Sequence, residues 1–369
     1  MTRSTRPPAR QTPTPSDSPT SPLLLDLALQ GGGSHGAFTW GVLDRLLEEE
    51  WLEIAAVSGT SAGAMNAVAL ASGLMEGGRE GARATLARLW RRVAELSPFH
   101  ALQNGPLGGL VDASAAWMTP WLAPWKHMAS TMGSQLSPYQ FNPLNLNPLR
   151  QILLDTVDFE RVRCCHKTQL FIAATEVRTG ALKVFDPRRL TPDMVLASAC
   201  LPLLFQAVEI DGEAYWDGGY AGNPSLMPLI VQSAADDLLL VQINPMERHG
   251  LPTSVGDITD RIDEVTFNAS LLKELRSIAL LKQLIADEDR PSHEYRNPLF
   301  QRVEALRVHL INGGESLRPL GSSSKTNTQW GFLQQLHTLG RSVAEDWLTQ
   351  NRGDMGKRSS WDMMQVLAP

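Results

Sequence analysis

Cysteine is scarce in this sequence, which has only Cys164, Cys165 and Cys200 among its 369 residues. An odd number with one adjacent pair makes a poor disulfide framework, and the spacing matches no metal-binding pattern. We therefore expect a reducing compartment, the cytoplasm.

Long apolar runs are also missing, since no stretch approaches the ~18 apolar residues that a transmembrane helix needs. Residues 1–21 are rich in Pro, Ser, Thr and Arg and lack the apolar core of a secretory signal peptide. We predict that this segment is a disordered tail. The expected location is cytoplasmic, with transient contact at a membrane surface as an open alternative.

Positive charge is in deficit, because 33 Lys and Arg face 39 Asp and Glu, a net charge of −6. This balance disfavours nucleic acid as a partner. Apolar residues make up 43% of the chain and charged residues 20%, which fits a globular protein with a sizeable core. Nothing in the composition indicates an oligomeric state.

The most informative stretch is 57–63, in which Gly59 and Gly63 bracket Ser61 in a Gly-x-Ser-x-Gly pattern. An apolar strand predicted for 54–58 precedes it, and a helix of small residues predicted for 62–72 follows. A serine on such a tight turn projects its hydroxyl from the top of a sheet. Ser61 is therefore our candidate nucleophile.

A glycine run, Gly31-Gly32-Gly33 and then Gly36, lies between a predicted strand at 23–30 and a predicted helix at 37–50. Backbone N–H groups at a strand-to-helix junction point outward and favour negative charge. We expect these groups to form an oxyanion hole for Ser61.

The same run also satisfies the dinucleotide-binding pattern Gly-x-Gly-x-x-Gly, which wants an acidic residue about 20 positions on, at the end of the second strand. Glu53 has that distance but precedes the second strand. Nucleotide binding is therefore the weaker alternative.

An aspartate ends a predicted hairpin, whose arms 208–210 and 213–216 flank an Asp-Gly turn. Asp217 follows the second arm and precedes two glycines, so its carboxylate can turn into a cleft. A second hairpin is predicted from 169–177 and 181–185, and buried strands from 238–243 and 308–311. Further helices are predicted at 80–95, 191–200, 257–286 and 329–349. This order predicts an α/β fold with a mainly parallel sheet and antiparallel edge hairpins.

Residues 97–148 lose all periodicity and read as a cap-like insertion near the mouth of the site. Trp117, Trp121 and Trp125 recur there every four residues. They are expected either to touch lipid at a membrane surface or, by a slight preference, to pack onto the domain.

With these pieces in order, the chain resembles the patatin-like phospholipase family. The carriers are the glycine run at 31–36, the serine turn at 59–63 and Asp217-Gly218-Gly219, with 197–202 and 223–224 as further features. The resemblance covers 23–244. It implies a three-layer α/β/α fold, which we divide into a catalytic domain at 22–312 and a helical C-terminal extension at 313–369.

The resemblance also implies a catalytic dyad of Ser61 and Asp217 acting on phospholipids or other lipid esters, as a phospholipase A or lysophospholipase does. The oxyanion hole would comprise Gly31, Gly32, Gly33 and Ala62, and the remaining motif residues are Gly36, Gly59, Gly63, Gly218 and Gly219. This scheme requires neither a metal ion nor an organic cofactor. Acyl transfer by the same dyad and lipid binding without catalysis are the alternatives.

Histidines enter this interpretation in two ways. A Ser-His-Asp triad is the weaker alternative to the dyad, with His249 or His309 as its base. His35 is a departure from the family pattern, because many members carry Arg or Lys there, and the charge beside the oxyanion hole could differ accordingly.

Overall fold

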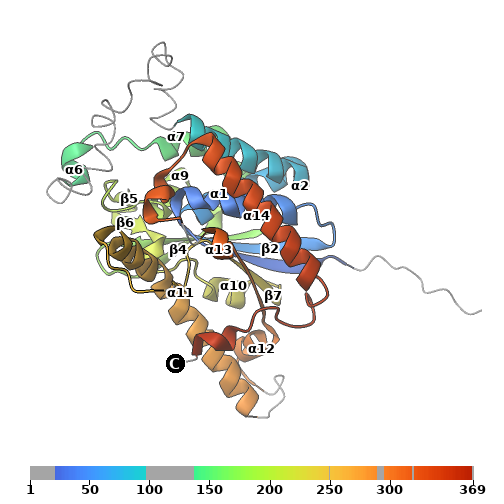
Figure 1. The fold of residues 1–369 in the computed structure, drawn as a ribbon. Helices are drawn as coiled ribbons and strands as arrows, with labels where there is room; N and C mark the ends of the chain where they lie inside the picture. Colours follow the sequence, from blue (N-terminus) through green and yellow to red (C-terminus); the bar gives the residue numbers. More distant parts are fainter. Residues whose placement is uncertain (1–20, 97–136, 249, 289–294, 318–319, 368–369) are drawn as a thin grey trace, which may run out of the picture.

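The structure is a computed structural model that describes residues 21–96, 137–248, 250–288, 295–317 and 320–367 (Figure 1). Its strands are β1 (Leu23–Leu29), β2 (Leu52–Gly59), β3 (Gln169–Glu176), β4 (Leu182–Phe185), β5 (Val208–Ile210), β6 (Glu213–Asp217), β7 (Asp237–Gln242) and β8 (Arg307–Asn312). They form one sheet in the order β5-β6-β3-β2-β1-β7-β8, with β4 paired to β3.

The sheet is parallel through its centre and on one side. The pairs β1–β2, β1–β7, β2–β3 and β7–β8 are parallel. The pairs β3–β4, β3–β6 and β5–β6 are antiparallel. Both predicted hairpins are therefore present, and the predicted mainly parallel sheet with antiparallel edges is confirmed.

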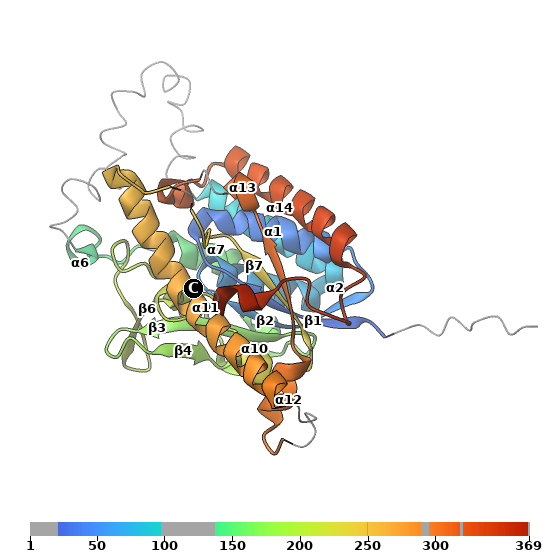
Figure 2. The same cartoon turned by 60° about the horizontal axis from the view of Figure 1, so that its bottom comes forward.

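Helices cover both faces of the sheet and make three layers (Figure 1). One face carries α1 (Gly36–Leu46), α2 (Ala62–Glu95) and α14 (Trp330–Asn351), and the other carries α10 (Met227–Gln232), α11 (Val255–Asp287) and α12 (Pro298–Ala305). Figure 2 shows α11 crossing the second face. The shorter helices are α6 (Pro138–Phe141), α7 (Pro148–Thr156), α8 (Phe159–Arg163), α9 (Pro192–Ser198) and α13 (Gly314–Leu317).

The pleat of the strands divides the core in two. In β1, Leu25, Leu27 and Leu29 belong to the apolar cluster under α1, α2 and α14, whereas Ala28 belongs to the cluster under α10, α11 and α12. Alternate side chains of a strand point to opposite faces, so a strand buried on both sides is apolar throughout. This explains why 23–30 reads as a continuous apolar run.

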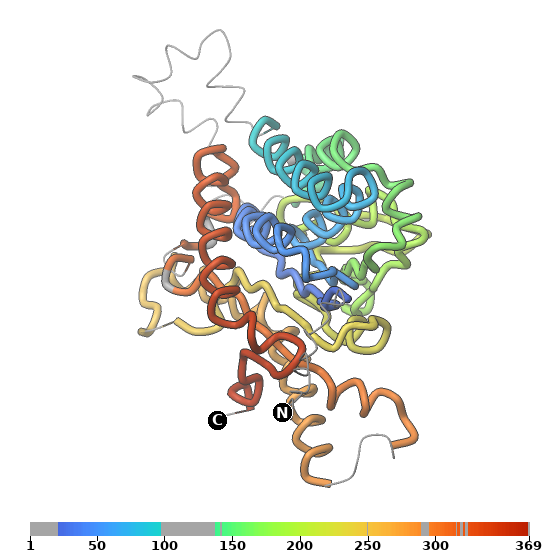
Figure 3. The backbone as a smooth tube through the Cα atoms, turned by 90° about the vertical axis from the view of Figure 1, so that its right-hand side faces the viewer, coloured from blue at the N-terminus to red at the C-terminus, as the bar shows by residue number. Residues whose placement is uncertain are grey.

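Two predicted helices lie within α2. The helices predicted at 62–72 and 80–95 are both present as its two helical segments, which are separated by a kink at Gly77 and Gly78, where the backbone is not helical. The helix predicted at 329–349 is α14, and it runs alongside α1 (Figure 3). Its side chains Leu333 and Leu336 are buried in the same cluster as Phe38, so this late segment completes the first layer.

Some predictions fall where the structure gives no description. Residues 1–20 of the predicted tail lie outside the described residues, and so do the three tryptophans of the predicted insertion. The division into two domains at residue 312 stays a prediction. Within the described ranges, no helix combines the length and apolar character needed to cross a bilayer, and no cluster of three His, Cys, Asp or Glu could bind a metal ion.

Candidate active site

Ser61 lies on the turn between β2 and α2, in a backbone conformation that residues with a side chain rarely adopt. Its φ is 54° and its ψ is −121°. The Ser61 N–H donates a hydrogen bond to Ser198 Oγ at 2.9 Å, and Thr60 Oγ1 donates to the Gly222 carbonyl at 2.6 Å. Neighbouring segments therefore hold the strained turn in place. The residue is 9% exposed, at the carboxyl end of the central strands.

The sheet register brings Asp217 to the level of this turn. Gly59 of β2 is aligned with Ile172 of β3, and two residues further along β3, Ala174 pairs with Asp217 of β6. Ser61 also lies two residues beyond Gly59. An antiparallel hairpin added to the parallel sheet thus returns an aspartate beside a serine that is 156 positions earlier in the chain.

The surroundings of Asp217 shield its carboxyl group from solvent. The side chain is fully buried. Its Oδ1 accepts the N–H of Gly219 at 2.7 Å, whereas the buried Oδ2 has no hydrogen-bond partner among the described residues. Burial raises the pKa of Asp217 to about 7, against the opposing effects of the Gly219 N–H, the Ser61 hydroxyl and the charge of Lys325. Such a carboxyl group can accept a proton near neutral pH.

The glycine run touches the serine turn directly. A Cβ on Gly31 would lie 2.7 Å from both Ser61 Cβ and the Thr60 carbonyl oxygen. Gly33 has a φ of +58°, in the region that favours glycine. The run continues into η1, a short 3₁₀ turn (Gly33–His35), and then α1. Close approach at Gly31 and positive φ at Gly33 explain why side chains are absent there.

The N–H groups of the predicted oxyanion hole are not equivalent. Gly31 donates its N–H to Asn223 Oδ1 at 2.7 Å and accepts from Asn244 Nδ2 at 2.7 Å with its carbonyl oxygen. The N–H groups of Gly32, Gly33 and Ala62 have no acceptor among the described residues. Gly31 is thus held in the turn by two asparagines, whereas the part of the chain that the structure describes offers no acceptor to the other three N–H groups.

The remaining motif glycines are places where chain segments meet. A Cβ would lie within 2.6 Å of a neighbouring atom at each of Gly36, Gly59, Gly63, Gly218 and Gly219. Asp217 is anchored in the same region, because its N–H donates to the Cys200 carbonyl and its carbonyl accepts from Thr175 Oγ1, both at 2.8 Å.

The residues that a Ser-His-Asp triad or a nucleotide site would need lie away from the serine turn or have other hydrogen-bond partners where the structure describes them. His309 is fully buried in β8, with Nε2 3.0 Å from Asp237 Oδ1 and Nδ1 2.9 Å from Ser360 Oγ. Glu53 pairs with Leu24 at the start of β2, at the opposite end of the sheet from the glycine run. His249 lies outside the described residues.

Around the site, the sequence marks His35 only as a departure from the family pattern and does not mark Asn244, Phe267 or Lys325 at all. His35 is buried, and burial together with the charge of Lys325 lowers its pKa to about 3, so the imidazole is neutral. Asn244, Phe267 and Lys325 reach the site from after the third motif, and each is a lone residue in an ordinary polar or amphipathic stretch. Only their contacts across the fold could identify them.

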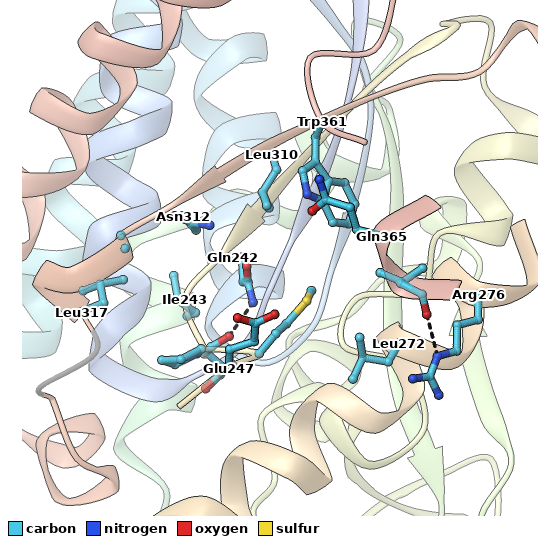
Figure 4. A pocket seen from close by; sticks show the side chains of 16 residues that line it. Gln242, Ile243, Glu247, Leu272, Arg276, Leu310, Asn312, Leu317, Trp361 and Gln365 are labelled. Atoms are coloured by element: carbon cyan, nitrogen blue, oxygen red, sulfur yellow. Dashed lines mark hydrogen bonds between the residues drawn. The ribbon is translucent and has the colours of Figure 1, made fainter. Parts of the chain in front are cut away.

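Two cavities lie outside this arrangement. One, of about 440 Å³, lies at the carboxyl ends of β7 and β8, where Arg276 donates to the Val366 carbonyl at its rim (Figure 4). Asn244, which donates to the Gly31 carbonyl, also lines this cavity, but neither Ser61 nor Asp217 does. The other, of about 550 Å³, is lined by residues of α1, α2 and α14, among them Trp40 and Trp330.

The mainly parallel sheet, covered by helices on both faces (Figure 1), defines an α/β protein. The chain belongs to the patatin-like phospholipase family, whose model matches residues 27–230. The comparison with curated proteins gives no significant match.

Solved structures give more distant likenesses. VipD from Legionella pneumophila is 15% identical with a TM-score of 0.39, and the alignment covers 90% of this chain and 67% of VipD. ExoU from Pseudomonas aeruginosa, solved in complex with SpcU, is 16% identical with a TM-score of 0.26, covering 90% of this chain and 78% of that one.

Proposed function

We propose that the protein is a serine lipid acyl hydrolase of the phospholipase A or lysophospholipase type, which cleaves carboxylic esters through Ser61 and Asp217. The observation that carries this proposal is the Asp217 carboxyl group. It is fully buried at the level of the strained Ser61 turn, with one oxygen unpartnered among the described residues and a pKa raised to about 7.

In the first half of the reaction, Ser61 Oγ attacks the carbonyl carbon of a lipid ester while Asp217 accepts the serine proton. The carbonyl oxygen becomes an oxyanion, which accepts the N–H groups of Gly32, Gly33 and Ala62. The ester bond then breaks, and Asp217 gives the proton to the leaving alcohol. The acyl group stays on Ser61 as an ester.

In the second half, water attacks the acyl-enzyme and Asp217 takes the proton of the water. The tetrahedral intermediate collapses, the fatty acid leaves and Ser61 recovers its proton from Asp217. We assign Gly31 a positioning role in both halves, because Asn223 already accepts its N–H.

Lipid as the substrate class is supported by family membership and by exposed apolar side chains close to the site. Leu203 is 81% exposed, three residues after Cys200, whose carbonyl accepts the Asp217 N–H. Tyr139 lies nearby, since its hydroxyl accepts the Ala207 N–H, and it is 59% exposed. We propose that this edge makes transient contact with a membrane surface during turnover.

The test compares wild-type protein with Ser61→Ala on a short-chain nitrophenyl ester and on phospholipid vesicles. Loss of the nucleophile should lower kcat by ~10⁴-fold or more. Ser277→Ala, in the exposed face of α11, is the matched control and should keep full activity. A fluorophosphonate should label wild type at Ser61 and leave Ser61→Ala unlabelled. An active Ser61→Ala variant would refute the proposal.

Product analysis separates the remaining alternatives. Transfer of the acyl group to an added alcohol in preference to water would identify an acyltransferase. Tight vesicle binding without ester cleavage or fluorophosphonate labelling would identify a lipid-binding protein without catalysis.

A further inference from the structure

A segment near the end of the chain contacts the glycine run. The 3₁₀ turn η6 (Ser322–Thr326) lies against η1, where His35 Nε2 and Ser324 Oγ are 2.7 Å apart. A Cβ on Gly33 would lie 2.3 Å from the Lys325 carbonyl oxygen. This segment, outside the part of the chain that matches the family, therefore packs against the glycine run.

The Lys325 side chain points toward the turn that carries Asp217. Its ammonium nitrogen lies 5.7 Å from the centroid of the Phe267 ring. That ring in turn packs on the turn after Asp217, because a Cβ on Gly219 would lie 2.3 Å from Phe267 Cε1. Gly219 donates its N–H to Asp217 Oδ1. One aromatic ring and one glycine thus connect the cation to the carboxyl group.

The other groups facing Asp217 are neutral. Burial raises the pKa of Cys200 and of Tyr220 to about 12, so both keep their protons at neutral pH. Ser61 is uncharged as well. Among the described residues, Lys325 is the cation whose charge acts on Asp217, and it favours the ionised form.

Charged groups of both signs, and one imidazole, face Lys325. They are His35, Arg248, Asp260, Asp263 and Glu264. His35 is neutral, and Glu264 is held by Arg248 at 2.6 Å and by Arg261 at 3.3 Å. Within the described residues no salt bridge joins Lys325 to a carboxylate. Burial lowers the pKa of Lys325, and the acidic residues of α11 oppose that effect.

We propose that Lys325 is a positioning residue of the active site, whose ammonium group favours the ionised, proton-accepting form of Asp217. The inference rests on the function proposed above. A cation near a buried carboxyl group acts through a medium that screens poorly, so its effect is larger than at the surface. The same segment packs on Gly33, so η6 supports both the base and the oxyanion turn.

The experiment measures kcat/KM of the full chain on a soluble nitrophenyl ester from pH 5 to pH 9, because the acidic limb reports the pKa of the free-enzyme base. Removing the cation in Lys325→Met should move that limb to higher pH. Activity on the limb then falls about tenfold for each pH unit moved, while the plateau at high pH changes little. Lys325→Arg keeps the charge and should keep the wild-type profile.

A second variant and a second readout guard against indirect effects. Lys325→Gln should move the limb in the same direction, and the rate of fluorophosphonate labelling at Ser61 should follow the same pH shift. A loss of activity by an equal factor at every pH, with the limb unmoved, would reduce Lys325 to a structural role and overturn the inference. A wild-type protein that neither cleaves esters nor is labelled would overturn the proposed function itself.

Discussion

Two parts of the chain build the site in different ways. The part that matches the family, 27–230, contains Ser61, Asp217 and the glycines in short motifs. The later part contributes Asn244, Phe267 and Lys325, each from a different element and without a motif. The first part contains the groups that we propose to react, and the second adds further contacts around them.

The difference has a physical reason. A nucleophile on a strained turn and N–H groups at a helix start need unusual backbone, which only a few residue types tolerate. Such a need leaves a pattern of glycine, serine and aspartate in the sequence. A supporting amide or ammonium group needs only to arrive at the correct point, and any helix, strand or loop can deliver it.

After loss of the nucleophile itself, the largest expected effect concerns the base, and the chain offers a matched control. Burial raises the pKa of both Asp217 and Asp26 to about 7, but Asp26 lies in β1 and accepts the Ser233 hydroxyl. Asp217→Asn should lower kcat by about 10²–10⁴-fold, as removal of a general base does. Asp26→Asn should keep wild-type kcat. The measurement is steady-state hydrolysis of a nitrophenyl ester at pH 8.

The raised pKa of Asp217 also predicts how activity and stability depend on pH. Wild-type activity should fall as pH drops below about 7, because protonated Asp217 cannot accept the serine proton. Stability should change in the opposite sense. A raised pKa means that the folded chain binds the proton more tightly than the unfolded chain, so this stabilisation is complete below about pH 4 and is lost as pH rises to about 7.

Asparagine remains neutral at every pH. Both variants should therefore unfold at a higher temperature than wild type at pH 8, with little difference at pH 4, in thermal melts followed by circular dichroism. Equal losses of activity in Asp217→Asn and Asp26→Asn would show that burial, and not contact with Ser61, sets the role of Asp217.

Much of the fold could be predicted from the sequence, because its signals are local. Apolar runs predict the buried strands, and Asp211-Gly212 predicts the β5–β6 hairpin, where both residues have positive φ. The placement of α14 beside α1 could not be predicted, because an amphipathic helix does not specify its partner. Similarly, the sequence marks Gly31 as part of a motif, but only the fold shows Asn223 and Asn244 holding it.

A smaller effect is expected from a methyl group at the contact between glycine run and serine turn. Gly31→Ala places a Cβ 2.7 Å from Ser61 Cβ, where backbone atoms must shift. Overpacking of this kind costs about 1–3 kcal/mol of unfolding free energy, and displacement of the nucleophile by about 1 Å lowers kcat by about 10²-fold. Urea unfolding and ester hydrolysis measure the two effects.

Gly331→Ala is the control for this substitution, because nothing lies within 4 Å of a Cβ at Gly331 in α14. It should leave kcat unchanged and leave stability unchanged or slightly higher. If Gly31→Ala were as active and as stable as this control, the serine turn and the glycine run would not depend on each other.

The smallest expected effect tests whether the second part of the chain matters to the first. Asn244→Ala removes the 2.7 Å hydrogen bond to the Gly31 carbonyl and leaves only the 3.5 Å contact from Asn223 Nδ2. A buried carbonyl that loses its partner costs about 1–3 kcal/mol, so urea unfolding should detect the change. We expect kcat to fall about tenfold or less, because the Gly31 N–H still binds Asn223. Asn312 is exposed and lines the same cavity of about 440 Å³ as Asn244. Asn312→Ala should therefore change neither the free energy of unfolding nor kcat. If Asn244→Ala matched that control, the glycine run would be held by the family-matching part of the chain alone. The proposed contribution of the later part to the site would then rest on Lys325.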